Sequence, residues 1–474
     1  MNGTSGAPPA DSAFSTTVSS FPARPAPGPP RPYHFPVFER VTLDNGLGVI
    51  VAPVRKLPLV TVSLVVPGGA GVERAGREGV ANLTALGLLE GTTRRDGNEM
   101  AERLEGMGAA LGAAADWDST VVTLTVLSAR LREAMALYGE VLREPAFPER
   151  EVERLKAERL AEILQLRTEP RGLADEMFAR FVYDASERYA HPEDGSTESV
   201  QRLMRADLVG HYAERFRPGG ATLVMVGDLS VDDGVGLARE LSAAWSGTAA
   251  ALPVPGSTPA NATRTVHLVQ KPAAPQSELR IGHVGLPRSH PDYFPVSVMN
   301  AVLGGLFSSR INLNLREAHA YTYGAFSGFG WRIGAGPFVA STAVRSDVTA
   351  AAAREVLNEI DRMRADGITE DERSLAVSYL DGVFPIKYET TDAIARALAA
   401  MVVYGLPSGY FDRYREWMRA VTREDVLRVA REHLHPDALQ LVAVGDPAVI
   451  RAPLEELNVG AVLEYDAEGQ RVTG

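Results

Sequence analysis

The spacing of apolar residues predicts several strands in the first quarter of the chain. Residues 59–66 are apolar almost throughout, which predicts a strand in the centre of a sheet. Residues 120–127 alternate valine and leucine with threonine, which is typical of a half-buried strand. Residues 38–51 predict two strands joined by a turn at Asn45-Gly46, because Asn-Gly is the strongest short hairpin signal.

A short apolar helix is predicted at residues 79–92, which read GVANLTALGLLEGT. Positions 82, 85 and 86 of such a helix share one face, because residues three and four apart lie above one another. That face consists of Asn82, Ala85 and Leu86, so it has no imidazole, carboxylate or thiol. Further helices are predicted at residues 97–107, 130–143, 148–167 and 206–216, and a strand at 221–226.

Residues 246–264 divide the chain into two halves. This stretch contains three prolines, one charged residue (Arg264) and no helical periodicity, so it predicts a linker. The predicted domains are therefore a first half at residues 36–245 and a second half at 265–474. Residues 1–35, rich in Pro, Ala, Ser and Gly, predict a disordered tail.

The second half repeats the first at an offset of 218 positions without gaps. The repeated positions are Asp207 and Asp425, Pro218 and Pro436, Gly227 and Gly445, and Asp228 and Asp446. Upstream of these positions the second half has predicted strands at 283–286 and 338–344, a helix with a glycine break at 301–315, and helices at 350–365 and 370–384. A chance recurrence of helix, turn, strand and Gly-Asp is the alternative, but the ungapped register favours duplication. The predicted fold class is α+β: two similar repeats, each a mostly antiparallel sheet with helices packed on one face, forming a clamshell half.

Composition excludes several classes of function. The net charge of −12 argues against a general nucleic-acid binder, and the absence of cysteine excludes disulfides and thiol catalysis. No apolar run reaches the roughly 18–20 residues of a membrane span. Residues 1–35 lack the apolar segment of a secretory signal, so we expect a cytoplasmic protein without a membrane span or nucleic-acid partner.

Sequence motifs for catalysis are scarce. None of the nine histidines lies in a His-Glu-x-x-His or His-x-x-Glu-His pattern, so we interpret them as surface or hydrogen-bonded structural residues. There is no Gly-x-Ser-x-Gly elbow and no Walker loop. The paired carboxylates of residues 149–162 are best explained as a solvated helix face.

One segment of the second half combines groups suited to peptide binding. Gly304 and Gly305 allow a close backbone approach, and Arg316 offers a planar set of hydrogen-bond donors. Tyr323, seven residues later, has a hydroxyl that can donate to a peptide carbonyl or an oxyanion. The alternative is a surface Arg–Glu pair beside a core tyrosine, which would give the same residues.

From residue 38 to the C-terminus the chain resembles the insulinase-like (M16) zinc metallopeptidase family. The segment SSRINLNLREAHAYTYGA is the most telling match, because the family's Arg-x6-Tyr pair, which holds the substrate, maps onto Arg316 and Tyr323. The family's zinc-binding segment maps onto residues 79–92, which retain Gly79, Ala81, Gly91 and Thr92. There Asn82, Ala85 and Leu86 replace the family's His, Glu and His. Glu162 lies at or near the third ligand position.

This resemblance implies that the chain is the non-catalytic subunit of a two-subunit peptidase. A catalytic zinc site needs about three protein ligands and an open position, and Glu162 alone cannot hold the ion. The chain is thus expected to have no metal of its own and to bind peptide beside a partner subunit that has zinc and the His-x-x-Glu-His motif. Two alternatives remain: a scaffold or peptide-binding protein, homodimeric or within a larger complex, and an independent metallopeptidase with rearranged ligands.

Overall fold

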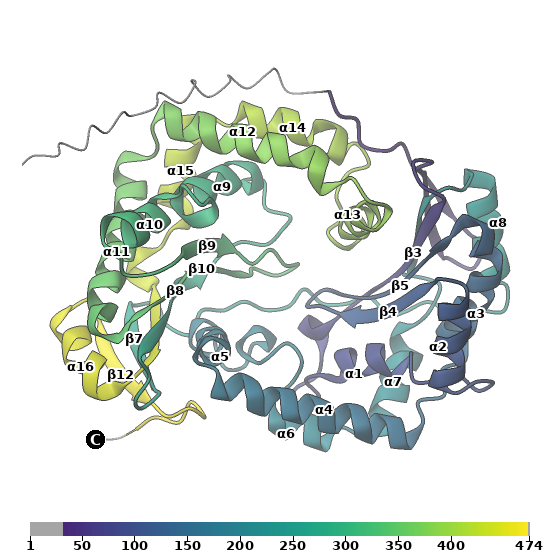
Figure 1. The fold of residues 1–474 in the computed structure, drawn as a ribbon, viewed down its shortest axis with the longest axis horizontal. Coiled ribbons are helices and arrows are strands. Elements are labelled where there is room, and N and C mark those ends of the chain that lie inside the picture. The colour runs from purple at the N-terminus through teal and green to yellow at the C-terminus, as the bar shows by residue number, and fades with distance from the viewer. Residues whose placement is uncertain (1–31, 473–474) are drawn as a thin grey trace, which may run out of the picture. The chain divides into compact units, whose positions relative to one another are not determined.

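The computed structural model describes residues 32–472 (Figure 1). Most of the predicted tail, residues 1–31, lies outside the described residues. The compact unit begins at His34. Phe35, at the end of the predicted tail, is buried and stacks on Phe411 with ring centroids 4.2 Å apart, so the packed chain begins slightly before residue 36. None of the described helices is long and apolar enough to cross a membrane.

The first half builds a sheet of six strands in the spatial order β1-β2-β6-β3-β5-β4. The strands are β1 (Glu39–Thr42), β2 (Gly48–Pro53), β3 (Leu59–Pro67), β4 (Ala110–Ala115), β5 (Ser119–Leu127) and β6 (Thr222–Gly227). The pair β2–β6 is parallel, and the other neighbours are antiparallel. The predicted hairpin is confirmed, with Gly46 at a φ of 86° in the turn between β1 and β2. The apolar strand β3 lies inside the sheet, as its sequence predicts.

The helices of the first half follow the predicted order, with additions. They are α1 (Val80–Gly87), α2 (Gly97–Gly106), α3 (Leu131–Arg143), α4 (Glu149–Thr168), α5 (Pro170–Val182), α6 (Thr197–Arg202), α7 (Arg205–Arg215) and α8 (Val231–Ser242). Helices α5, α6 and α8 and strand β4 were not predicted. Side chains from the sheet and from α1, α3 and α7 form one apolar core with Leu64, Leu83, Tyr138 and Leu208 fully buried.

The second half builds a matching sheet in the order β12-β7-β11-β8-β10-β9. Its strands are β7 (Thr265–Gln270), β8 (Gln276–Val284), β9 (Ala325–Phe329), β10 (Pro337–Arg345), β11 (Gln440–Gly445) and β12 (Ala461–Tyr465). The strand predicted at 283–286 was misplaced: β8 begins at Gln276. The centre of β8 contains Arg280, a buried charge that ion-pairs with Asp175 of α5. A charged residue in this position breaks the apolar pattern by which a buried strand is recognised.

Helices follow and connect the strands of the second half. They are α9 (Tyr293–Asn300), α10 (Arg310–Asn312), α11 (Thr349–Asp366), α12 (Glu370–Lys387), α13 (Thr391–Val403), α14 (Tyr410–Ala420), α15 (Arg423–His433) and α16 (Pro447–Glu456). The glycine break predicted within the helix at 301–315 is confirmed, because the first helical turn ends at Gly305 and α10 begins only at Arg310. Two π-helical turns, η4 (Ala301–Gly305) and η5 (Leu313–Ala318), flank the short α10.

The two sheets confirm the predicted fold class and its internal repeat. Strands β6 and β11 occupy the same place in the two sheets and are offset by the 218 residues seen in the sequence. The outermost strand breaks the repeat. In the first sheet β1 comes before β2 and is antiparallel to it, whereas in the second sheet β12 comes from the C-terminal end and is parallel to β7.

Each sheet is also covered by one helix from the other half. Helix α5 of the first half packs on β8 and β11, where Leu173, Met177 and Phe181 share an apolar cluster with Val269 and Val442. Helix α13 of the second half packs on β3 and β6 (Figure 1). The hydroxyls of Thr391 and Thr61 are 2.9 Å apart there. Helices α5 and α13 occupy equivalent places in the two halves, since α5 follows α4 as α13 follows α12, so the exchange is reciprocal. The sequence did not predict this exchange.

Candidate functional site

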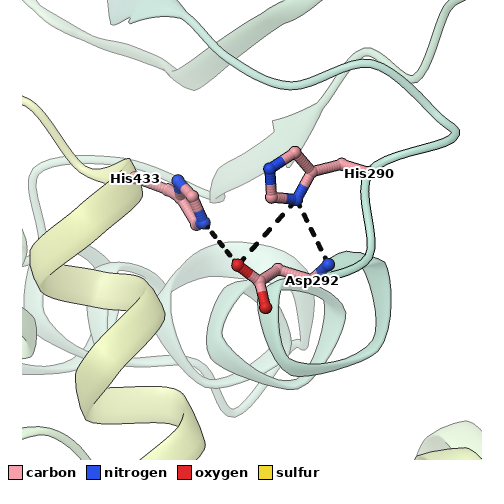
Figure 2. A group of neighbouring side chains, drawn as sticks. All are labelled: His290, Asp292 and His433. Atoms are coloured by element: carbon pink, nitrogen blue, oxygen red, sulfur yellow. Dashed lines mark hydrogen bonds and ion pairs between the residues drawn. The ribbon is translucent and has the colours of Figure 1, made fainter.

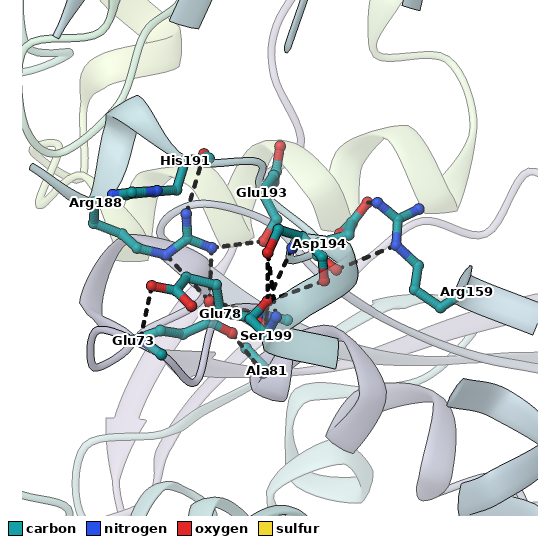
Figure 3. A network of polar contacts seen from close by, with 12 residues as sticks. Glu73, Glu78, Ala81, Arg159, Arg188, His191, Glu193, Asp194 and Ser199 are labelled. Atoms are coloured by element: carbon teal, nitrogen blue, oxygen red, sulfur yellow. Dashed lines mark hydrogen bonds and ion pairs between the residues drawn. The ribbon is translucent and has the colours of Figure 1, made fainter. Parts of the chain in front are cut away.

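Helix α1, which carries Asn82, Ala85 and Leu86, is held at its N-terminus by Glu73. The Glu73 carboxylate accepts hydrogen bonds from the backbone N–H groups of Gly79 (3.0 Å) and Ala81 (2.7 Å). Arg188 donates to the same carboxylate at 2.7 Å, and both side chains are buried (Figure 3). Burial raises the pKa of Glu73, and the Arg188 guanidinium opposes this effect. The ion pair fixes the start of α1 and is a structural contact that the sequence did not reveal.

The face of α1 that carries Asn82, Ala85 and Leu86 is part of the packing of the first half. Ala85 is fully buried, and Leu86 is half-buried and packs against the core of the first half. Asn82 is half-buried beside them. Helix α1 contacts α4, α7 and β4, so its faces are engaged by neighbouring elements. A cation at this face would lose water without gaining charged ligands, which is unfavourable.

Glu162, on α4, is mostly exposed and is held by a neighbour on its own helix. Arg159 donates to its carboxylate at 3.1 Å, and the Glu162 side chain is 63% exposed. The same arginine reaches the backbone oxygen of Asp194 at 3.2 Å, which links α4 to the loop before α6 (Figure 3). Glu162 therefore belongs to an ordinary ion pair on the surface of α4.

Arg316 and Tyr323 lie at either end of a short turn that leads into β9, the outermost strand of the second sheet. Arg316 belongs to the π-helical turn η5, and such turns are frequent at functional sites. Its guanidinium carbon lies 4.6 Å from the centroid of the Phe307 ring, and its Nε lies 3.4 Å from Glu317. Tyr323 is 92% exposed, so its ring is presented to solvent rather than to the core.

Hydrogen bonds make the turn around Tyr323 rigid. The Thr322 hydroxyl donates to the carbonyl of Gly324 (3.0 Å) and accepts from the Gly324 N–H (3.1 Å). Thr342 of β10 reaches the same carbonyl at 3.1 Å. The Asn312 side chain accepts from the backbone of Ala325 at 3.0 Å in a buried position. The backbone that bears the exposed tyrosine is therefore fixed from both sides.

The structure brings Arg316 and Tyr323 together and separates them from the glycines. Both side chains line one pocket of about 450 Å³, together with Arg345. Gly304 is buried against Ser327 of β9, where any side chain would collide. Gly305 is exposed and lines a different, smaller pocket of about 240 Å³. Gly304 thus serves the packing of the segment, and the pocket contains the Arg–Tyr pair without the glycines.

Most histidines have the structural surroundings expected from the sequence. His267 stacks on Phe181 with ring centroids 4.2 Å apart, and burial lowers its pKa to about 4. His283 is buried, and its pKa is likewise lowered to about 4. The exception is a cluster of His290, Asp292 and His433, whose members are far apart in the chain.

The chain belongs to the insulinase-like peptidase family M16. The model for the insulinase (M16) peptidase domain matches residues 50–188, and the model for the M16 inactive domain matches residues 202–380. A zinc protease of Mycobacterium tuberculosis, described as uncharacterized, is 25% identical over 83% of this chain and 90% of its own length. Subunit 1 of the bovine mitochondrial cytochrome b-c1 complex is 25% identical over 55% of this chain and 54% of that subunit.

Solved structures agree with this assignment. An M16 inactive domain from Pseudomonas fluorescens matches with a TM-score of 0.81 and 29% identity, covering 86% of this chain and 98% of that one. A protease from Helicobacter pylori has the same fold at 19% identity, with a TM-score of 0.81 over 87% of this chain and all of that one.

Proposed function

We propose that this protein is the non-catalytic, peptide-binding subunit of a two-subunit M16 zinc peptidase. The observation that supports the proposal is the contrast between its two key sites. The α1 positions that would bind zinc are Asn82, Ala85 and Leu86, which are buried or half-buried and include no imidazole or carboxylate. Arg316 and Tyr323, by contrast, line one solvent-accessible pocket. A pure scaffold has no need for an exposed tyrosine held on a rigid turn.

In this proposal the partner provides zinc and the general base through a His-x-x-Glu-His motif. Zinc there would polarise the peptide carbonyl and activate water. The residues of this chain would bind and orient the substrate. Arg316 would donate to a substrate carbonyl, and the Tyr323 hydroxyl would donate to the oxyanion that forms as water adds. The edge strand β9, next to Tyr323 in sequence, would lie close to the bound peptide.

Reconstitution tests this assignment. The chain is co-expressed with an M16 protein from the same genome that contains His-x-x-Glu-His, and cleavage of a quenched fluorescent peptide is measured. Tyr323→Phe should lower turnover by about 10²–10³, as loss of one oxyanion donor does, while leaving co-purification intact. Tyr379→Phe, at another exposed tyrosine outside this pocket, is the matched control and should retain full turnover. Unchanged turnover for Tyr323→Phe would contradict the assignment.

A structural subunit is the second candidate. It is favoured by the similarity to the cytochrome b-c1 subunit, which covers slightly more than half of this chain. In that case the complex would form with a partner and show no dependence on Arg316 or Tyr323. The reconstitution experiment therefore separates the two functions in one assay.

A further inference from the structure

His290, Asp292 and His433 come together where the start of α9 meets the end of α15 (Figure 2). His290 precedes α9, Asp292 is the residue before its first turn, and His433 is the last residue of α15. The His433 Nε2 atom lies 2.8 Å from Asp292 Oδ2, and His290 Nδ1 lies 3.9 Å from the same oxygen. The Asp292 carboxylate makes no capping hydrogen bond to α9, so it is oriented toward the two imidazoles.

The spacing of these atoms suits a metal ion. Bonds of 2.0–2.2 Å in a tetrahedral zinc site place ligand atoms about 3.3 Å apart. The two distances to Asp292 Oδ2, 2.8 and 3.9 Å, are on either side of that value, and all three ligand atoms lie within 4.8 Å of one another. His290 Nδ1 accepts the N–H of Asp292 at 3.2 Å, so this nitrogen carries no proton, and an ion bound to it would displace this long hydrogen bond. Small side-chain rotations would bring the three atoms onto one ion.

The charges around the cluster favour a cation. Arg428 donates to both carboxylate oxygens of Asp292, at 2.7 and 3.1 Å, and lowers the pKa of Asp292 to about 2. Arg428 also pairs with Glu432 at 2.8 Å, and Glu432 lies 4.0 Å from His433 Nε2. With neutral imidazoles, the two carboxylates and one guanidinium leave one net negative charge.

We propose that His290, Asp292 and His433 bind one divalent transition metal ion of the zinc class. Two imidazoles and one carboxylate are a donor set suited to such ions. The fourth position is open to water or to Glu432, whose side chain is half exposed. The ion would fasten α9 to α15 beside a pocket of about 490 Å³ that His290, Asp292, Tyr410 and Trp417 line. This metal lies in the second half and has no relation to the replaced positions on α1.

Zinc binding to the full chain tests the proposal without any partner subunit or activity. The protein is prepared without a histidine tag, stripped of metal and titrated with Zn²⁺ by calorimetry and with Co²⁺ by visible absorption. We expect one ion per chain, intense tetrahedral Co²⁺ bands and a melting temperature that rises with zinc concentration, because a ligand that binds only the folded state stabilises it.

His290→Gln is the decisive variant, because it removes one ligand and leaves the Asp292–His433 and Asp292–Arg428 contacts in place. It should weaken zinc binding by more than the roughly 10–100-fold that loss of a hydrogen bond supporting a ligand costs. His319→Gln, at an exposed histidine outside the cluster, is the matched control and should bind like the wild type. Equal zinc affinity of His290→Gln and wild type, or the absence of saturable binding to the wild type, overturns the proposal.

Discussion

The two halves of the molecule share one architecture and differ in where they place reactive groups. In the first half, α1 follows β3, and its N-terminus is fixed by the buried Glu73–Arg188 pair. In the second half, α9 follows β8 and continues into the π-helical turns that lead to Arg316. The same position in the repeat is thus a packed helix in one half and, in the other, the start of the segment that carries the proposed substrate-binding pair.

The contact between equivalent helices shows the same divergence. Helices α1 and α7 in the first half correspond to α9 and α15 in the second, and a pocket lies beside each pair. In the first half this region contains the ion pair of Arg77 and Asp207 at 2.9 Å. In the second half it contains the two imidazoles of the proposed metal site. A fixed helix packing can therefore be secured by ion pairs or by a cluster capable of binding metal.

Placing a carboxylate back on α1 should have the largest effect on stability. Ala85→Glu introduces an unpaired charge at a fully buried position and should lower the free energy of unfolding by about 4 kcal/mol or more. Ala101→Glu, at an exposed position of α2, should change it by less than about 0.5 kcal/mol. Urea denaturation measures both. A tolerated Ala85→Glu would mean that the face is still an accessible site, contrary to the comparison above.

The exchanged helices should contribute similarly to the two halves. Leu173→Ala on α5 and Leu398→Ala on α13 each truncate a fully buried leucine and should cost about 3 kcal/mol. Leu164→Ala, at a leucine that is 68% exposed, is the control and should have little effect. We expect one unfolding transition in denaturant for every variant, since each half is covered by a helix of the other. Two separate transitions would show that the halves fold independently.

Acid should reveal a difference between the equivalent strands β2 and β7. His267 of β7 occupies the register position that Ile50 occupies in β2, opposite Val442 and Val224 respectively. The folded state protonates His267 only near pH 4, whereas an unfolded histidine takes up its proton near 6.5. The unfolded chain binds more protons in this window, so stability falls as pH drops from about 6.5 to 4, by up to roughly 3 kcal/mol.

His267→Ile should remove this contribution and flatten the pH dependence measured by denaturation at pH 7 and pH 5. Part of the pH dependence of stability should remain in this variant, because burial also lowers the pKa values of His283 and His211 to about 4. His319→Gln, at an exposed histidine, should leave the slope of the wild type unchanged. An undiminished slope in His267→Ile would show that protonation of His267 does not limit acid stability.

The smallest predicted effect concerns the turn that holds Tyr323. Thr342→Val removes the hydrogen bond to the Gly324 carbonyl, and a neutral hydrogen bond contributes about 1 kcal/mol. Turnover of the reconstituted pair should therefore fall by about fivefold. Thr123→Val removes a hydrogen bond to Ser63 between β3 and β5 of the first half and should leave turnover unchanged. Equal losses in both variants would indicate a general effect of destabilisation.

Local patterns in the sequence predicted much of the fold. The apolar run of β3 and the 218-residue repeat predicted two related α+β halves. A buried strand shows as a run of apolar residues, and a duplication shows as residue types that recur at a fixed offset. Arg316 and Tyr323 were predicted to lie together because only one turn separates them, and they do line one pocket. Their role in binding peptide stays a prediction.

The features that escaped prediction depend on contacts between distant residues. Asp292 and His433 are separated by 141 positions, so no spacing rule could join them. Strand β8 was misplaced because it contains the charged Arg280. The charge is tolerated there because Asp175, 105 residues earlier in the chain, pairs with it. The sequence of residues 170–182 predicted neither helix α5 nor its packing on the second sheet. Such pairings become visible only when the tertiary fold brings the partners together.

The exchange of α5 and α13 constrains how such a chain could have arisen. A polypeptide that ended at the linker would leave the apolar side of α5, with Leu173 and Phe181, without the sheet that covers it. In a dimer of two identical copies of that polypeptide, α5 of each copy could pack on the sheet of the other. Gene duplication would then have fused a domain-swapped dimer into one chain. Expressing either half alone should accordingly yield an obligate dimer or an insoluble product, and mixing the two halves should restore a soluble one-to-one complex.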